Sequence, residues 1–275
     1  SEANDPALIV RATATDCSGG VQISFRDSIE KFDCTNDEGQ VIEVIHRTWT
    51  ATDKHGNVSS GVQKITVRAL PRSALRFPAP YVELSCTQGT SFAQISSAKG
   101  FINARPYYRS PRTNRDRLLP LSGELCDYVG TFEDSAPIFT CGENCRSSFK
   151  FIRTWTVMNW CTGDVSKGHQ LIAVLDTIPP SIMDLPDIIG PFSVNAWGCD
   201  VDITLPRAKV TDVCDLDAQI VAIEGPFGLT ISKLGSDWIA KGVPSGVHTF
   251  IYTASDCCGN LSTAEIRVVV KDRVS

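Results

Sequence analysis

Apolar and polar residues alternate along three short stretches of the chain: Val62-Gln-Lys-Ile-Thr-Val67, Gln170-Leu-Ile-Ala-Val174 and Ala264-Glu-Ile-Arg-Val-Val-Val270. A period of two residues predicts a strand with one buried face. No segment carries a long apolar period of 3.6 residues, which would indicate an amphipathic helix. Many short strands between Gly, Pro, Asn and Asp turns predict an all-β fold of tandem antiparallel β-sandwiches.

A stretch rich in Thr and aromatic residues precedes each alternating run: Arg47-Thr-Trp-Thr-Ala-Thr-Asp-Lys-His-Gly-Asn57, Arg153-Thr-Trp-Thr-Val-Met-Asn-Trp-Cys-Thr-Gly163 and Phe250-Ile-Tyr-Thr-Ala-Ser-Asp-Cys-Cys-Gly-Asn260. The copies begin roughly 100 residues apart, which is the size of one small sandwich domain. One position holds an aromatic residue that we expect to fill the core of its unit: Trp49, Trp155 or Tyr252. Another holds a residue expected to close the hairpin with an Asx-type turn: Asp53, Asn159 or Asp256.

Proline marks the boundaries between the repeats. Leu70-Pro71 follows the first closing strand, and Pro179-Pro180 follows the second. Paired prolines stiffen a connection into an extended form. We therefore predict three units at residues 1–72, 73–179 and 180–275, of which the first lacks a clear opening strand and the second carries a basic loop insertion.

Composition narrows the class of protein. The chain has 275 residues, a formal charge of −5 and 42% hydrophobic residues. The mild acidity argues against a nucleic-acid binder, and no apolar run approaches the ~18 residues of a membrane-spanning helix. Eleven cysteines indicate an oxidising compartment, and the odd number leaves one thiol free or paired outside this segment. The first residues contain neither Met nor a signal region, so we expect a mature or excised segment of a longer protein.

The third copy carries a family resemblance through Pro244-Ser-Gly246 and Val247-His-Thr-Phe-Ile-Tyr-Thr-Ala-Ser-Asp-Cys-Cys-Gly-Asn260. These residues resemble the closing hairpin of hyalin-repeat immunoglobulin-like domains. The Arg-Thr-Trp-Thr forms and Val174-Leu-Asp-Thr-Ile-Pro-Pro180 are similar to tandem repeats in very large surface proteins of Bacteroidota. The resemblance implies three immunoglobulin-like sandwiches in an extracellular, cell-surface protein of the type IX secretion class, which includes gliding and attachment adhesins.

Cysteine positions within the repeats suggest a set of bridges. Cys17–Cys34 is the simplest choice in the first unit. Cys86–Cys161 and Cys199–Cys258 are predicted as equivalent bridges between an early strand and the late turn, with Cys214–Cys257 beside the latter. Cys126 is expected to pair with Cys141 or Cys145, and that choice stays open.

Two metal readings compete with these assignments. Cys141 and Cys145 have the spacing of zinc ligands, and Cys126 with Cys161 would complete four thiolates. The other units use cysteine without that spacing, which favours disulfides. Asp212, Asp215 and Asp217 flank Cys214 and offer the oxygen ligands that calcium prefers, although turn formation is the commoner role. No cofactor is therefore expected, with calcium left open.

A basic segment stands out in the acidic chain. Between Lys99 and Arg117, six basic residues face one acid. It offers candidates for contact with an acidic polysaccharide or an acidic face of a neighbouring subunit: Arg105, Tyr107, Tyr108, Arg109, Arg112, Arg115 and Arg117. The alternative is a solvated loop between strands. Trp160, Trp197 and Trp238 lie outside the shared aromatic position and are candidates for binding glycans.

Three triplets resemble the aspartate–hydroxyl–apolar acceptor of O-glycans in Bacteroidota, with Ser28, Ser135 and Thr177 as the acceptors. An enzyme is not expected, because the chain has no phosphate-binding Gly loop, no HExxH and no GxSxG motif. Glu124, Asp127, Glu133 and Asp134 form the nearest carboxylate cluster.

The sequence thus predicts a structural or adhesive segment of a long extracellular protein, a disulfide-stiffened stalk or fibre able to self-assemble into a filament. Its partners would be neighbouring repeats or copies of itself, and surface polysaccharide is a further candidate. Neither nucleic acid nor membrane insertion is expected. The alternative is a glycan-binding sandwich that assists adhesion or a secreted enzyme.

Overall fold

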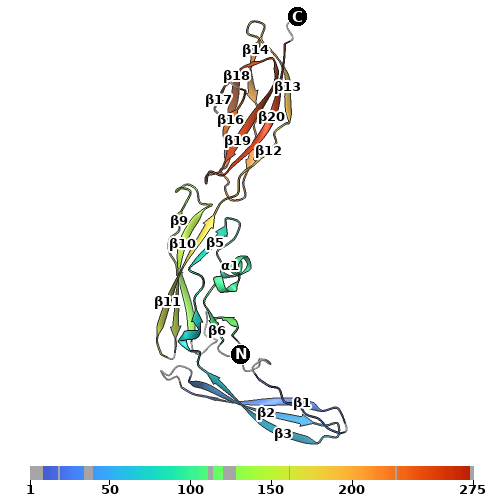
Figure 1. The fold of residues 1–275 in the computed structure, drawn as a ribbon, viewed down its shortest axis with the longest axis vertical. Helices are drawn as coiled ribbons and strands as arrows, with labels where there is room; N and C mark the ends of the chain where they lie inside the picture. The colour runs from blue at the N-terminus through green and yellow to red at the C-terminus, as the bar shows by residue number, and fades with distance from the viewer. Residues whose placement is uncertain are drawn as a thin grey trace. The chain divides into compact units, whose positions relative to one another are not determined.

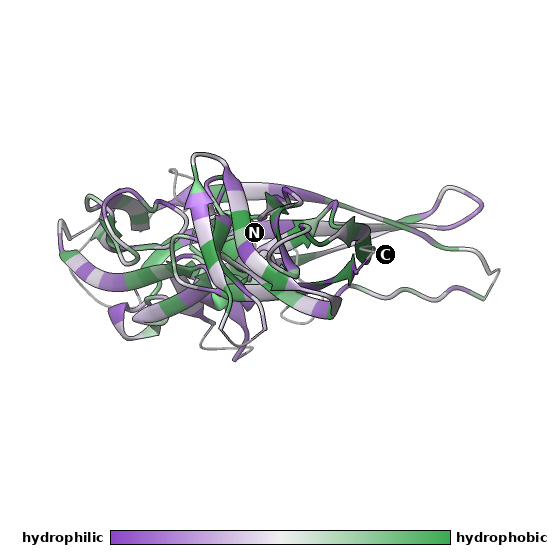
Figure 2. Cartoon of the chain, turned by 90° about the horizontal axis from the view of Figure 1, so that it is seen from above, coloured by the Kyte–Doolittle hydropathy of each residue, from purple (hydrophilic) through white to green (hydrophobic). Residues whose placement is uncertain are grey.

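A computed structural model describes residues 9–17, 19–33, 40–110, 114–119, 128–160, 162–226 and 228–272. Nearly every element in these ranges is a strand, and all but one of the strand pairs whose register is established are antiparallel (Figure 1). Apolar and polar residues alternate along the longer strands (Figure 2). The predicted all-β fold of immunoglobulin-like sandwiches is confirmed.

The first repeat forms one antiparallel sheet of β1 (Gln22–Lys31), β2 (Val41–Thr52) and β3 (Val58–Arg68), in that order. The register places Phe25 opposite Trp49 and Trp49 opposite Gly61, so these three residues share one face of the sheet. Ile45 and Ile65 on the same face are buried with Ile9 and Val67 packed against them. Among the described residues that precede β1, Ile9 packs against this cluster and the Gln63 side chain donates to the Val10 carbonyl at 3.1 Å.

The second repeat builds two layers. One sheet has the order β5 (Tyr81–Ser85), β11 (Val165–Leu175), β10 (Phe149–Asn159) and β8 (Tyr128–Asp134), with β9 (Ile138–Phe139) paired to β10. The smaller sheet contains β4 (Leu75–Arg76), β6 (Tyr107–Arg109) and β7 (Asp116–Leu118). The second repeat also contains the helix α1 (Phe92–Lys99) and two 3-10 helices, Arg72–Ala74 and Phe101–Asn103. Ser91 caps α1 through a capping box with Gln94, which fixes where the helix begins.

The third repeat is a complete sandwich. One sheet has the order β13 (Ile188–Ser193), β20 (Leu261–Lys271), β19 (Gly246–Ser255) and β16 (Gln219–Glu224). The other contains β14 (Asp200–Leu205), β18 (Asp237–Pro244) and β17 (Thr230–Leu234), and a short pair joins β12 (Ser181–Met183) to β15 (Lys209–Thr211). Both large sheets contribute to one core, in which Ile203 and Val243 meet Phe250, Tyr252 and Ile266.

Contacts divide the chain into two compact units. The first contains Ser1–Val82, Ser91–Ser135 and Ile152–Leu171, and the second contains Glu83–Thr90, Ala136–Phe151 and Ile172–Ser275. The division passes through β5, β10 and β11. Each hydrogen-bonded sheet nevertheless lies within one of the three sequence ranges proposed above. The three-domain boundaries themselves stay a prediction.

Two of the three aromatic residues at the shared position fill a core as predicted. Trp155 and Tyr252 have no exposed surface, and the Tyr252 hydroxyl donates to the Pro206 carbonyl at 3.0 Å. Burial raises the pKa of Tyr252. Trp49 is only partly buried.

Candidate functional site

The hairpin turns are built by Asx residues, as the sequence predicted. Asp256 accepts from the Asn260 backbone at 2.8 Å, and the Asn260 side chain donates back to Asp256 at 2.6 Å. Asp53 and Asn57 repeat both bonds in the first sheet at 2.8 Å each. The glycine before each Asn has a positive φ, 83° at Gly259 and 88° at Gly56, which a residue without a Cβ adopts freely.

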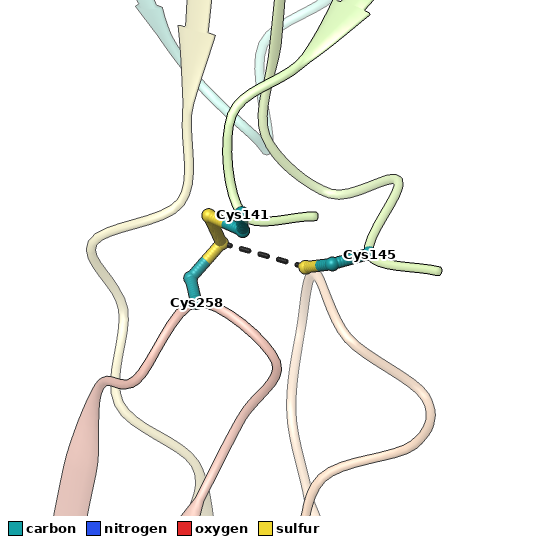
Figure 3. Close-up of side chains that lie close together, drawn as sticks. All are labelled: Cys141, Cys145 and Cys258. Atoms are coloured by element: carbon teal, nitrogen blue, oxygen red, sulfur yellow. Dashed lines mark hydrogen bonds between the residues drawn. A yellow bond between two sulfur atoms is a disulfide. The ribbon is translucent and has the colours of Figure 1, made fainter. Parts of the chain in front are cut away.

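The turn of the third repeat carries two adjacent cysteines that form separate bridges. Cys258 is bonded to Cys141, and Cys257 is bonded to Cys145. Cys141 and Cys145 stand on one short loop, which turns at Gly142. Figure 3 shows Cys145 beside the Cys141–Cys258 bridge, and the Sγ atoms of Cys145 and Cys258 are 3.6 Å apart. Because Cys145 is bonded to Cys257, the two bridges lie side by side. Two neighbouring bonds between the same two loops restrict rotation as well as separation.

A third bridge in the same compact unit joins Cys86 to Cys214. Two aspartates support this region. Asp215 accepts from the Cys257 backbone N–H at 2.7 Å, and the backbone carbonyl of Asp176 accepts from the Asn260 side chain at 3.2 Å. Asp176 is itself buried, and its Oδ1 accepts from the Ile178 N–H at 3.2 Å. The turn and its bridges are therefore held by polar contacts as well as by covalent bonds.

The predicted partner of Cys258 was wrong, and strand length explains why. Cys199 directly precedes β14, whose first residue Asp200 pairs with Pro244. Cys258 lies beyond the other end of β19, which begins at Gly246. The ten residues of β19 span about 30 Å, so a bridge between the two cysteines is excluded. Cys199 is an exposed free thiol.

The other pairings also need correction. Cys86 is bonded to Cys214 and not to Cys161, because Cys86 follows β5 and its N–H donates to Leu175 at the end of β11. Cys161 precedes β11 and lies outside the described residues. The pair Cys214–Cys257 is likewise replaced by bridges to Cys86 and Cys145.

Two further cysteine assignments fall partly outside the described chain. Cys17 is an exposed free thiol, so the predicted bridge to Cys34 is not formed, and Cys34 itself lies outside the described residues. Cys126 also lies outside them. Its proposed partners Cys141 and Cys145 are each bonded to the third repeat instead.

The structure brings together a different set of sulfur atoms from the four cysteines proposed as zinc ligands. Within the described ranges, Cys141, Cys145 and Cys258 are close enough to share an ion, as are Cys86, Asp176 and Cys214. Every cysteine in these groups is in a disulfide, so none offers a thiolate ligand in this state.

The calcium candidates act as turn residues. Asp212 accepts from the backbone of Cys214 and of Asp215 at 2.7 and 2.8 Å. Asp215 accepts from Asp217 at 2.9 Å. These bonds build the turn that positions Cys214.

The basic segment forms the β6–β7 hairpin. Arg109 pairs with Asp116 directly across the hairpin, with both of its nitrogen contacts at 2.8–3.0 Å, and Asp116 therefore has a lowered pKa. Tyr108 packs on a buried cluster that includes Leu119 and Tyr128. Arg115 is exposed, Arg105, Tyr107 and Arg117 are partly buried, and Arg112 lies outside the described residues. The contact surface for acidic partners stays a prediction, and Arg109 and Arg115 are its exposed arginines among the described residues.

Two of the proposed O-glycan triplets contain an aspartate with a structural task. Asp27 on β1 accepts two bonds from Arg47 at 2.7 and 2.8 Å, and Asp134 on β8 accepts two from Arg153 at the same distances. Both arginines are almost fully buried. All three residues proposed to carry the glycan are exposed, namely Ser28, Ser135 and Thr177. Ser135 Oγ also accepts a hydrogen bond from the Ile152 N–H. Modification stays a prediction.

Each arginine lies over aromatic rings. The Arg47 guanidinium carbon is 4.1 Å from the centre of Phe25 and 5.7 Å from Trp49. Arg153 is 4.9 Å from Phe132 and 5.9 Å from Trp155. Two-pronged ion pairs and cation–π contacts reinforce one another where water is excluded. The Arg47 hydrogen bonds lower the pKa of Asp27.

This repeated cluster was missed from sequence, although a signal was present. Phe25-Arg-Asp-Ser28 and Phe132-Glu-Asp-Ser135 share the spacing Phe-x-Asp-Ser. Cross-strand pairing then sets Asp opposite Arg and Phe opposite Trp in both sheets.

Of the three tryptophans proposed for glycans, two are well exposed. Trp197 is 98% exposed and Trp160 is 61% exposed. Trp238 instead packs against the third core, with Lys233 over its ring at 5.7 Å.

No family model matches the chain, and no curated protein matches it. An endo-fucoidan hydrolase of glycoside hydrolase family 107 aligns over 93% of this chain and 42% of its own length, at 14% identity and a TM-score of 0.24. The human desmocollin-1 ectodomain aligns over 84% of this chain and 48% of its own length, at 12% identity and a TM-score of 0.31. Protocadherin gamma B2 cadherin domains 3–6 align over 92% of this chain and 78% of their own length, at 10% identity and a TM-score of 0.28. The chain spans less than half of the first two structures, and likeness at these scores carries no argument about function.

Within the described ranges, no helix has the length and apolar character needed to cross a bilayer.

Proposed function

We propose that this chain is a load-bearing, adhesive segment of a long extracellular surface protein of the hyalin-repeat type. The paired bridges between the Cys141–Cys145 loop and the Cys257-Cys258 turn carry this proposal. Disulfides persist in oxidising surroundings. A doubly bridged joint resists stretching and twisting, which suits a stalk or fibre. The resemblance to Bacteroidota surface repeats supports export by the type IX system.

Force spectroscopy tests the load-bearing role. The Cys86–Cys214 bridge encloses 128 positions of sequence, which hold back about 45 nm of extended chain at roughly 3.5 Å per residue. Pulling the oxidised chain from its ends should therefore release about 45 nm less than pulling the reduced chain. A Cys199→Ser variant, which changes an exposed free thiol, is the control and should behave as the unmodified chain. If the oxidised and reduced chains released equal lengths on pulling, the bridges would not hold back any chain, and the load-bearing role would be refuted.

Surface location and self-association need separate measurements. An antibody against this chain should label intact source cells, and labelling only after permeabilisation would contradict an extracellular role. Cys17 and Cys199 are exposed thiols that suit bridges between copies. Sedimentation of the oxidised chain should show dimers that reductant removes, whereas a monomer under both conditions would contradict thiol-linked assembly.

Glycan binding is the second candidate function, and the exposure of Trp197 favours it. An indole that projects into solvent offers a flat apolar surface for stacking on a sugar ring. A glycan array should report binding that is lost in a Trp160→Ala/Trp197→Ala/Trp238→Ala variant. Full retention of glycan binding by that variant would eliminate these tryptophans as the site.

A further inference from the structure

The edge strands β5 and β13 occupy the same place in the middle and third repeats, each beside the closing strand of its sheet. The Cys86 N–H donates to the carbonyl of Leu175, the last residue of β11, at 2.9 Å. The Val194 N–H likewise donates to the carbonyl of Lys271, the last residue of β20, at 3.3 Å. The residue that follows the edge strand is therefore equivalent in the two repeats, Cys86 in the middle one and Val194 in the third.

Cys199 stands in the loop that begins at Val194. The Asn195 N–H donates to the Asp200 carbonyl at 2.9 Å, and the Asn195 side chain donates to Asp200 Oδ1 at 3.3 Å. Asn195 Oδ1 also accepts from the Trp197 N–H at 3.0 Å. These bonds bring the end of the loop, where Cys199 precedes Asp200, back to its beginning. An exposed free thiol thus lies in the loop whose counterpart holds the bridged Cys86.

The first repeat places a second free thiol at the position of Cys214. Gln22 begins β1 and Gln219 begins β16, and both pair with the residue three positions after the shared aromatic residue. Cys17 and Cys214 each stand five residues before that Gln, and a Thr-Asp pair precedes each cysteine. Cys17 is exposed and free, whereas Cys214 is bonded to Cys86. The chain therefore carries both halves of the Cys86–Cys214 arrangement a second time, unbonded.

The other bridge positions of the first and third repeats match each other as well. The turn of the first repeat holds Lys54 and His55 where the turn of the third repeat holds its two bridged cysteines. In the third repeat, Ser245 alone joins β18 to β19, whereas the loop before β10 of the middle repeat holds the partners of those cysteines. The first repeat thus lacks the two bridges for which the third repeat has no cysteines, and each keeps one thiol.

We propose that Cys199 of one copy of this chain forms a disulfide with Cys17 of a second copy, so that the chain polymerises head to tail. The bond repeats between copies what Cys86–Cys214 does between the middle and third repeats. This inference deepens the self-association proposed above and rests on that extracellular role. The two thiols belong to different loops, so the contact is heterologous, and a copy bonded at one loop keeps its other thiol for the next copy.

The bond needs a two-electron oxidant, which a small-molecule disulfide such as oxidised glutathione supplies. The thiolate of Cys199 attacks one sulfur of the oxidant and releases the first reduced thiol. The thiolate of Cys17 then attacks the Cys199 sulfur of the mixed disulfide and releases the second. One S–S bond of the oxidant breaks, one S–S bond between copies forms, and the two protons from the cysteines end on the two released thiols.

Single substitutions distinguish head-to-tail bonding from other pairings. Cys17→Ser and Cys199→Ser variants, each treated alone with oxidised glutathione, should stay monomeric on a non-reducing gel. An equal mixture of the two variants should give a dimer and nothing longer. The unmodified chain should give a ladder of longer species that reductant removes. A Cys17→Ser/Cys199→Ser variant is the control for all other cysteines, and a ladder like that of the unmodified chain would overturn the proposal.

Mass spectrometry locates the bond between copies. Trypsin releases Cys17 in residues 12–26 and Cys199 in residues 168–207, with no other cysteine in either peptide. When unlabelled and ¹⁵N-labelled chains are mixed, this peptide pair should join unlabelled to labelled chains and should exceed either pair of like peptides at least about tenfold.

Four results would each overturn the proposal: dimers of either single variant alone, a statistical mixture of the three pairings, bonds within one copy only, or glutathione adducts without cross-links. None of these results would affect the load-bearing role, because the pulling experiment depends on the Cys86–Cys214 bridge within one copy.

Discussion

The two adjacent bridges should contribute redundantly rather than additively to the stability of the second compact unit. Cys141–Cys258 joins residues 117 positions apart, and Cys145–Cys257 joins residues 112 apart. Closing a loop of this size removes about 5 kcal/mol of chain entropy from the unfolded state. Once one bridge is formed, the other closes a ring of only a few residues and adds about 2 kcal/mol.

The perturbation is to remove the bridges singly and together. Cys145→Ser/Cys257→Ser and Cys141→Ser/Cys258→Ser should each lower the free energy of unfolding by about 2 kcal/mol, because the remaining bridge still closes the long loop. The variant that lacks both should lose about 7 kcal/mol, which is about 3 kcal/mol more than the two single losses together.

Native-state hydrogen exchange of the β19–β20 hairpin, combined with guanidinium unfolding of the oxidised chain, measures these losses. Cys199→Ser is the matched control, because it removes a sulfur that is exposed and unbridged. Losses of about 5 kcal/mol for each single-bridge variant, or no further loss when both are removed, would refute the idea that the bridges share one long loop.

Two further predictions concern the first compact unit. Gly168→Ala should lower the free energy of unfolding by about 1–3 kcal/mol because its Cβ meets Phe77, whereas Gly61→Ala should be neutral because no described atom lies within 4 Å of its Cβ. Guanidinium unfolding measures both, and equal effects would contradict a role for the Phe77 contact. Arg47 lowers the pKa of Asp27, so the stability this pair gives is present above about pH 4 and is lost as pH falls through the lowered pKa. Urea unfolding between pH 2 and about 7 should show this loss, and an Asp27→Asn variant that loses stability just as steeply would exclude this carboxyl as the cause.

Local sequence determined the strands and the turns of this protein. The period-two alternation located β3, β11 and β20, and the repeated Asp or Asn located the hairpin turns. These features depend on neighbours along the chain, since a pleat and an Asx bond are set within a few residues. The shared aromatic position could also be predicted from the sequence, because the alternation along its strand places it on the buried face of the hairpin.

Pairing between distant segments was not readable in the same way. The sequence positions of Cys199, near an early strand, and Cys258, in the late turn, predicted a bridge between them, but the full length of β19 separates the two residues. Likewise the Asp of two presumed glycan acceptors holds a buried arginine one strand away. Sequence spacing gives no distance between strands, and only the register sets which side chains meet.

What the sequence determined by itself was the repeat: three copies of a strand–turn–strand unit with an aromatic residue at a fixed place. What only the tertiary structure decided was how each copy is completed. The middle copy covers its arginine with Phe92, and the third replaces that arginine by Phe250 in an apolar core. In the described part of the first copy, a groove lies beside Trp49. The covering segments come from outside the repeated motif, so their contacts depend on three-dimensional packing and not on the motif.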